Sequence, residues 1–111
     1  MKTFGECLRD IRDRKGLSVR QLAYTAGVEP GYVSKLENDL CQPSNDKLRD
    51  LAKALDMNPH ILMLMAGRLS DEVVAVARKH PEALMALMNT LPKSSEKTLL
   101  RAATMVRDGK W

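Results

Sequence analysis

The sequence predicts an all-α fold, and three observations support this prediction. Apolar residues recur at three- and four-residue spacing along much of the chain, which is the repeat of a helix with one buried face. No segment keeps the alternation of apolar and polar residues that is typical of a half-buried strand. Serine or asparagine caps, and prolines at first helical positions, also mark the starts of several helices.

Length and composition fit one small domain, with or without a helical appendage. The chain has 111 residues, of which 44% are apolar and 4% aromatic, so leucine, methionine, alanine and valine must fill the core. No run approaches the roughly 20 apolar residues that span a bilayer. The amino-terminal segment MKTFGECLRDIR is charged and amphipathic and lacks a secretory apolar region, so we expect a cytoplasmic protein.

The charge balance favours a polyanionic partner only mildly. The net charge is +4, and the pI is near 9.3. Residues 1–67 contain ten Lys/Arg and nine Asp/Glu, a net of +1, whereas residues 68–111 contain eight and five, a net of +3. Overall charge therefore does not identify a nucleic-acid-binding region. The local placement of cations such as Arg20, Lys35 and Lys47 determines whether such a surface exists.

The first predicted helix lies in the segment FGECLRDIR. Cys7, Leu8 and Ile11 fall on its apolar face, which makes Cys7 a small core residue. Cys41 lies in a later loop and is expected to be exposed. Two cysteines so far apart in sequence indicate neither a metal cluster nor a disulfide framework.

Two short helices joined by a turn are predicted between Leu17 and Glu37. Ser18 precedes an apolar-periodic run, and Gln21 follows it by three residues, which is the spacing of a capping box. The buried stripe of this helix consists of Leu22, Ala23 and Ala26. Ala23 is small, so a second helix can cross close by. Gly27 ends the first helix, because the residue after the last turn often needs a positive φ.

The second of these helices is predicted to start at Pro30, where the missing N–H would have had no partner. Val33 and Leu36 turn inward, and Val28 packs the turn into the core. The residues expected to point outward are Glu29, Gly31, Tyr32, Ser34, Lys35 and Asn38. A face of small and hydrogen-bonding residues can approach base edges closely, and two such helices outline a helix-turn-helix that fits the DNA major groove.

Helical signals continue after this motif. Ser44 or Asn45 caps a helix whose residues at core spacing are Leu48, Leu51, Ala52 and Leu55. Asn58 and Pro59 form a cap and a first helical position. The short helix that they open contains Ile61, Leu62, Leu64 and Met65. Gly67 is predicted to end this globular unit.

Four segments together resemble the phage-repressor/Cro-like (XRE-type) helix-turn-helix domain of bacteria and phages. They are FGECLRDIR, GLSVRQLA, AGVEPGYVSKLEN and PSNDKLRDLAKALDM, in that order. The resemblance covers about Phe4 to Gly67. It implies a lambda-repressor-like DNA-binding domain of five helices over residues 1–67, with a recognition helix at residues 30–38. The helical signals that follow predict a short helical carboxy-terminal extension over residues 68–111.

The resemblance also implies an ion pair between Arg12 and Glu37. In such domains an arginine on the first helix commonly pairs with a glutamate that ends the recognition helix, and these two residues stand at those positions. A partly buried, bidentate pair of this kind would fix the orientation of the helices.

The sequence departs from the family pattern at two places. The family usually has glycine after the recognition helix, whereas this chain has Asn38 and Asp39, the types that best tolerate left-handed backbone. Family members often place a phosphate-binding glutamine where this chain has Val19. Arg20, Gln21 or a backbone N–H at the helix N-terminus is then expected to bind the phosphate.

These observations predict a sequence-specific DNA-binding transcriptional regulator, a homodimeric repressor encoded by a bacterium or phage. Each helix 30–38 would enter the major groove of one half of a pseudo-palindromic operator, with half-sites roughly 34 Å apart.

Ser34 and Lys35 are expected at base edges, with Lys35 suited to guanine O6 and N7. The alternative for Lys35 is a solvated surface lysine. Gly31 permits close approach, and Tyr32 reaches a phosphate or a thymine methyl. The predicted DNA-binding set is Arg20, Gln21, Glu29, Pro30, Gly31, Tyr32, Ser34, Lys35, Asn38 and Lys47, of which Arg20, Gln21, Asn38 and Lys47 hold the DNA backbone.

The extension carries much apolar surface for a short segment. Helices are predicted to start at residues 70–72, at Pro81 and after Pro92, the last of them running toward Trp111. The apolar residues of the middle helix are Leu84, Met85, Leu87, Met88 and Leu91. They fit self-association into a dimer, packing on the same subunit, or a site for a partner or effector within residues 70–111.

An enzyme finds little support in the sequence. His60 lies near a helix start and His80 at a helix junction, and both fit exposed polar residues because no ligand set accompanies them. No glycine-rich phosphate loop, zinc-ligand spacing or nucleophile motif occurs, so no metal or cofactor is expected. Two rivals to a simple repressor remain: an antitoxin or anti-regulator whose tail binds a partner while DNA binding is autoregulatory, and a regulator that senses a small molecule among its methionine-rich helices.

Overall fold

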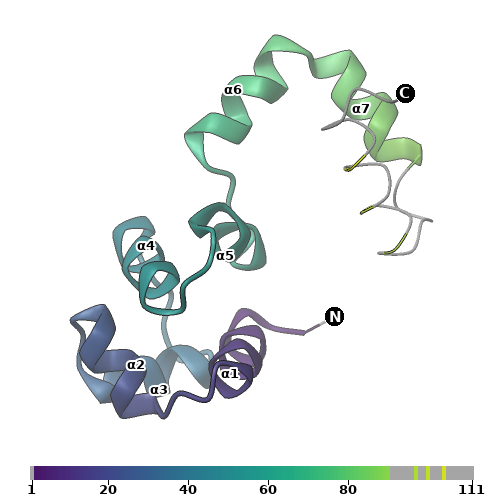
Figure 1. Ribbon diagram of the computed structural model, residues 1–111. Helices are drawn as coiled ribbons and strands as arrows, with labels where there is room; N and C mark the ends of the chain where they lie inside the picture. Colours follow the sequence, from purple (N-terminus) through teal and green to yellow (C-terminus); the bar gives the residue numbers. More distant parts are fainter. Residues whose placement is uncertain (1, 91–96, 98–99, 101–103, 105–111) are drawn as a thin grey trace. The chain divides into compact units, whose positions relative to one another are not determined.

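A computed structural model describes residues 2–90 together with residues 97, 100 and 104 (Figure 1). Residues 2–90 form seven helices: α1 (Phe4–Arg14), α2 (Val19–Ala26), α3 (Pro30–Glu37), α4 (Asn45–Ala54), α5 (Pro59–Met65), α6 (Asp71–Lys79) and α7 (Pro81–Thr90). No strand occurs among the described residues. The predicted all-α fold is confirmed.

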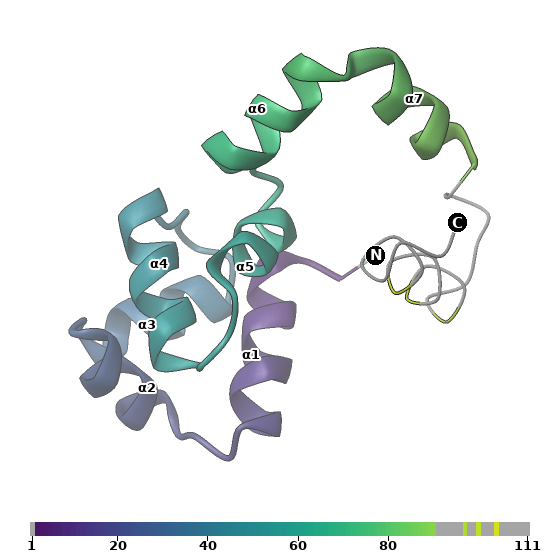
Figure 2. The same cartoon turned by 45° about the horizontal axis from the view of Figure 1, so that its top comes forward.

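The chain divides into two compact units after Ser70, three residues beyond the predicted boundary at Gly67. The first unit holds the five helices α1 to α5. Within it α3 contacts α1 and α2, and α4 contacts α2 and α5, as the two views in Figures 1 and 2 show. The second unit begins at Asp71 with α6 and α7, which contact each other.

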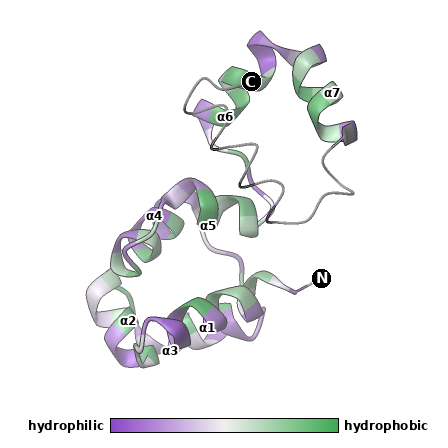
Figure 3. Cartoon of the chain, turned by 45° about the vertical axis from the view of Figure 1, so that its right-hand side comes forward, coloured by the Kyte–Doolittle hydropathy of each residue, from purple (hydrophilic) through white to green (hydrophobic). Residues whose placement is uncertain are grey.

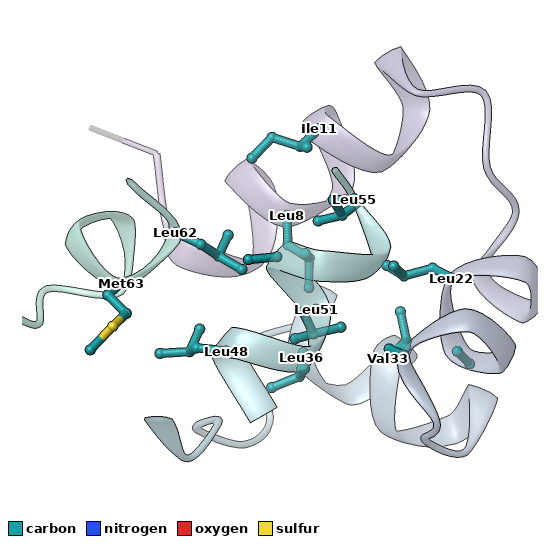
Figure 4. Packing of buried hydrophobic residues seen from close by; sticks show 13 residues of the cluster. Leu8, Ile11, Leu22, Val33, Leu36, Leu48, Leu51, Leu55, Leu62 and Met63 are labelled. Atoms are coloured by element: carbon teal, nitrogen blue, oxygen red, sulfur yellow. The ribbon is translucent and has the colours of Figure 1, made fainter. Parts of the chain in front are cut away.

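Side chains from all five helices of the first unit converge on one core (Figure 4). The core residues are Leu8, Ile11, Leu22, Ala23, Ala26, Val33, Leu36, Leu48, Leu51, Ala52, Leu55, Leu62 and Met63. Most of them come from the three- and four-residue repeats that the sequence displays. Burial of each large aliphatic side chain contributes roughly 1.5–3 kcal/mol, so this cluster is the main source of the unit's stability.

Local capping sets the starts of the helices. Ser18 and Gln21 form the predicted capping box at α2, with the Ser18 hydroxyl accepting from the Gln21 N–H at 3.0 Å. The Ser44 hydroxyl accepts from the Lys47 N–H at 3.2 Å, so Ser44 rather than Asn45 caps α4. The Asn58 side chain accepts from the His60 N–H at 2.9 Å at the start of α5.

The turn after α3 is left-handed although it lacks glycine. Asp39 takes a φ of +57°, whereas Asn38 stays at −96°. The Leu40 N–H then donates to the Lys35 carbonyl at 2.8 Å, which closes the helix end. Of the two residues singled out in the sequence, Asp39 is the one that adopts left-handed backbone.

The structure corrects three expectations for polar and small side chains. Cys7, expected in the core, is only half-buried and lies outside the core cluster. Cys41, expected to be exposed, is half-buried and packs against that cluster. His60 is half-buried rather than exposed, and its Nδ1 atom is shielded from solvent with no hydrogen-bond partner among the described residues. For Cys7, helical period identifies the approximate face but not the depth of burial, and for Cys41 and His60 the depth depends on packing that local sequence does not reveal.

Several apolar side chains are exposed in the described part of the second unit. No residue of α6 is buried, and Val76 is 62% exposed. On α7, Met85, Leu87 and Met88 are each about half exposed, and Figure 3 shows apolar colour along much of this helix. The predicted helix after Pro92, Leu91 and the terminal Trp111 lie outside the described residues.

Among the residues that the structure describes, no helix is both long and apolar enough to cross a membrane.

Candidate nucleic-acid interface

The turn between α2 and α3 brings the two helices into contact. Gly27 ends α2 with a φ of +72°, a value open to glycine without steric cost. The Val28 N–H then donates to the Ala23 carbonyl at 2.9 Å, and the half-buried Val28 side chain packs against the core. Ala23 is fully buried, as its small size predicts for a close helix crossing.

The outer face of α3 carries small and cationic side chains. Val33, Leu36 and Glu37 are buried, whereas Pro30, Gly31, Ser34 and Lys35 are exposed. A Cβ atom added to Gly31 would meet nothing within 4 Å. Packing inside the protein therefore does not require glycine at this position. Close approach of another molecule to this face would still favour glycine there.

Tyr32 departs from the predicted outward set. It is half-buried and packs against the core, and this burial raises the pKa of its hydroxyl above the ordinary range. A shallow hollow of about 380 Å³ lies beside it, lined by Gly27, Val28, Glu29, Tyr32 and Lys47. The hollow joins the first turn of α3 to α4, so Lys47 lies near the start of α3.

The N-terminus of α2 offers a second polar surface. The Gln21 Oε1 atom accepts from the Ser18 N–H at 2.7 Å, and the side chain of Gln21 is exposed. Its amide nitrogen has no partner among the described residues and can donate to an anion. Arg20 beside it is also exposed. Val19 packs against the core instead, which accounts for an apolar residue where related domains often have glutamine.

Arg12 and Glu37 make the bidentate contact that the resemblance implies. The Arg12 Nε donates to Glu37 Oε2 at 2.6 Å and Nη2 donates to Oε1 at 3.0 Å. The Glu37 side chain is buried, at 3% exposure, and the Arg12 side chain is partly buried, at 12%. Hydrogen bonding to Glu37 raises the pKa of Arg12 above its usual range. A third donor, Nη1, reaches the Leu17 carbonyl at 2.8 Å, so Arg12 ties α1 to both the loop before α2 and the end of α3.

Sequence analysis missed the contribution of Arg9 to this network. The Arg9 Nε donates to Glu37 Oε1 at 3.2 Å, and Nη2 donates to Asn38 Oδ1 at 3.3 Å. The Asn38 amide nitrogen in turn donates to the Ser34 carbonyl at 2.8 Å. Both ends of the Asn38 amide are therefore engaged within the protein. The three-residue spacing of Arg9 and Arg12 places them on one helix face and could have indicated a shared partner.

A close contact between α1 and the end of α3 was also not foreseen. A Cβ atom on Gly5 would lie 2.5 Å from the carbonyl oxygens of Leu36 and Glu37, so only glycine fits there. The Asp39 carboxylate accepts from the Gly5 N–H at 2.9 Å and from the Thr3 hydroxyl at 2.7 Å. Thr3 and Glu6 show the spacing of a capping box, and that signal was available in the sequence.

The described residues contain no group of three or more His, Cys, Asp or Glu side chains placed to hold a metal ion. The site is thus an exposed helix, α3, that a network of arginines and carboxylates fixes against α1, with the polar start of α2 and Lys47 nearby. Such an arrangement can present hydrogen-bond donors to base edges and phosphates.

Comparison with known proteins decides the family. Residues 3–62 match the model of a helix-turn-helix domain. This chain belongs to the phage-repressor-like helix-turn-helix family. The predicted resemblance is confirmed.

Three similar proteins illustrate the match. An uncharacterized HTH-type transcriptional regulator of Mycobacterium tuberculosis is 36% identical over 74 residues, which are 67% of this chain and 53% of that protein. The restriction-modification controller protein C.AhdI of Aeromonas hydrophila is 39% identical, with a TM-score of 0.52 over 53% of this chain and 89% of its own. The P22 c2 repressor, in complex with a synthetic operator, is 27% identical, with a TM-score of 0.52 over 56% of this chain and 94% of its own.

This chain spans about half the length of the curated relatives that it matches. The match falls on the helix-turn-helix unit. Relatives in this family are transcriptional regulators and not enzymes, in agreement with the prediction for this chain.

Proposed function

We propose that this chain is a sequence-specific DNA-binding transcriptional regulator that acts as a homodimeric repressor in the cytoplasm of a bacterium or of a phage-infected cell. The observation that carries the proposal is the outer face of α3, where Gly31, Ser34 and Lys35 stand clear of the core. The helix enters the major groove with this face toward the bases. Lys35 donates to guanine O6 and N7, Ser34 hydrogen-bonds a neighbouring base edge, and Gly31 lets the backbone come close.

Contacts to phosphates position the helix in the groove. Gln21 donates through the amide nitrogen that its capping bond leaves available, and Arg20 and Lys47 add cations on either side. Asn38 takes part by fixing the end of α3 through the Ser34 carbonyl, since its amide is already engaged. Because the cations are few, the affinity should fall only moderately with salt.

Dimerisation places two copies of α3 on one face of the duplex, one helical turn apart. The exposed apolar residues of α7, which include Met85, Leu87 and Met88, supply a surface that a second copy can cover. A further apolar face lies on α5, where Ile61 and Leu64 are about half exposed. The operator is accordingly a pseudo-palindrome.

The deciding experiment is selection of bound duplexes from a randomised DNA pool by the full chain at physiological salt. Enrichment of a pseudo-palindrome with one-turn half-site spacing supports the proposal and supplies the operator. Light scattering over a range of protein concentrations reports the dimer independently. Failure to enrich any sequence, with protein that circular dichroism shows to be folded, contradicts it.

A second candidate is an antitoxin or anti-regulator whose carboxy-terminal helices bind a partner protein, with autoregulatory DNA binding. The uncovered apolar side chains of α6 and α7 favour it, because a partner can cover them as well as a second copy can. A chain that stays monomeric in solution and enriches no DNA sequence by itself would favour this candidate over the repressor, with DNA binding then dependent on the partner protein.

A further inference from the structure

Glu29 stands at the start of α3, and neither a hydrogen bond nor an ion pair among the described residues holds its carboxylate. It is the N-cap residue, with a φ of −74° and a ψ of 143°, yet its side chain makes no capping hydrogen bond. Serine, threonine, aspartate and asparagine are the residues that cap helices well, since a longer side chain reaches past the first N–H groups. The Glu29 side chain is exposed and has no ion-pair partner within 4.0 Å among the described residues.

A carboxylate at this place faces an electrostatic penalty if α3 enters DNA. The residues at the N-terminal end of a recognition helix contact base edges, and phosphates line both sides of the groove. Lys47 borders the same hollow as Glu29 and partly offsets this repulsion. The remaining cost is compensated only where the carboxylate receives a hydrogen bond from a base.

The chemistry of the major groove leaves one base that suits a carboxylate. An ionised carboxylate only accepts hydrogen bonds. Guanine presents the acceptors O6 and N7 and thymine presents O4, so both repel it. Adenine presents an amino donor next to the acceptor N7, which opposes the second carboxylate oxygen. Cytosine presents the N4 amino donor without an acceptor of its own on that edge.

We propose that Glu29 is a specificity-determining residue that selects cytosine, through its N4 amino group, at one position of each half-site. This inference rests on the proposed function, because it requires α3 to lie in the major groove. Lys35 then reads a guanine farther along α3, since residues 29 and 35 are separated by six positions, about 1.7 turns or roughly 9 Å at 3.6 residues per turn and 1.5 Å per residue. Glu29 rejects guanine and thymine at its position, whereas Lys35 attracts guanine at another.

The test compares the operator selected by the unaltered chain with those selected by Glu29→Gln and Glu29→Ala. Glutamine donates and accepts, and it pairs with adenine N6 and N7, so Glu29→Gln should change one cytosine per half-site to adenine. Glu29→Ala should lose the preference at that position alone. A good direct contact discriminates by roughly 5- to 150-fold, and the binding ratio of the cytosine to the guanine duplex should fall by that factor.

Asp56→Asn provides the matched control. Asp56 is exposed between α4 and α5 and has a φ of +52°, which asparagine tolerates, so this variant removes one negative charge without altering α3. It should select the same operator as the unaltered chain, with a small uniform gain in affinity.

The outcomes separate the inference from the proposed function. If the unaltered chain enriches an operator and Glu29→Gln selects the same one, Glu29 does not read a base and the inference is wrong. A uniform gain in affinity for both Glu29 variants, equal to that of Asp56→Asn, would show that only its charge acts. If the unaltered chain enriches nothing, it is the proposed function that fails.

Discussion

Replacing two glycines at equivalent helix positions with alanine should have opposite effects on the stability of the first unit. Gly5 is the second residue of α1, and Gly31 is the second residue of α3. A methyl group on Gly5 would lie 2.5 Å from two backbone carbonyl oxygens, whereas one on Gly31 would meet nothing within 4 Å. Gly5→Ala should therefore destabilise the first unit, and Gly31→Ala should not.

The size of the Gly5→Ala effect follows from the contacts that must yield. Overpacking typically costs about 1–3 kcal/mol, and here the neighbours are backbone atoms that cannot turn aside. The same shift weakens the hydrogen bond from the Gly5 N–H to the Asp39 carboxylate, a bond of a class that contributes about 1.5–3 kcal/mol. Replacing glycine in a helix returns about 0.5–1 kcal/mol. The net loss should be roughly 2–4 kcal/mol.

Thermal and urea unfolding of the full chain, followed by far-ultraviolet circular dichroism, measure this difference. A loss of this size lowers the Tm of a unit with fewer than 100 residues by about 10 °C or more. Gly31→Ala should keep or raise the Tm, because alanine only removes conformational freedom from the unfolded chain. Equal Tm values for the two variants would refute the close docking of α1 against the end of α3.

Three further changes test the network and the DNA-facing surface. Arg12→Ala leaves the buried Glu37 carboxylate with only Arg9, and should destabilise the unit by about 3 kcal/mol in urea unfolding, so an unchanged midpoint would contradict the role of the pair. Ser18→Ala removes the cap of α2 and should cost about 1 kcal/mol in the same assay, whereas no loss would mean that the cap contributes nothing. Lys35→Ala should relax base preference at one position per half-site in selected DNA pools, and a uniform loss of affinity would make Lys35 a phosphate contact instead.

Most helix starts could be predicted because capping is a local matter. The Ser18 and Gln21 pair, Pro30 at the first position of α3 and Asn58 before α5 are each readable from a few neighbouring residues. Helical period also places Leu48 and Leu51 in the core, since the polar residues Arg49 and Asp50 separate them in α4. These features need no knowledge of distant contacts.

Helical periodicity cannot predict the buried face of a helix that is apolar on every side. In α5, the segment PHILMLM offers no polar face to mark the outside. The structure buries Leu62 and Met63 and exposes Ile61 and Leu64, and contact with α4 settles this choice. The half-burial of Tyr32 has the same origin, because it depends on the loop and α4 residues that pack beside α3.

Long-range contacts account for the parts of the site that sequence reasoning missed. The Arg9 guanidinium, the glycine at position 5 and the Asp39 carboxylate are each unremarkable within their own segments. Their roles arise only when α1 lies against the end of α3, some 30 residues later in the chain. Only the Arg12 and Glu37 pair was anticipated, and it came from family resemblance and not from spacing.

The structure separates the residues that hold α3 from those that face outward on it. Glu37 and Asp39 bind α1 through side chains, and Leu36 meets Gly5 through its backbone, so the end of the helix is fixed from within. Gly31 and Lys35, by contrast, face outward and make no packing contact that stability requires. Substitutions on this outer face should therefore cost little in folding, and under the proposed function they would alter the base sequence that α3 reads. A regulator built in this way can change its operator while keeping its fold.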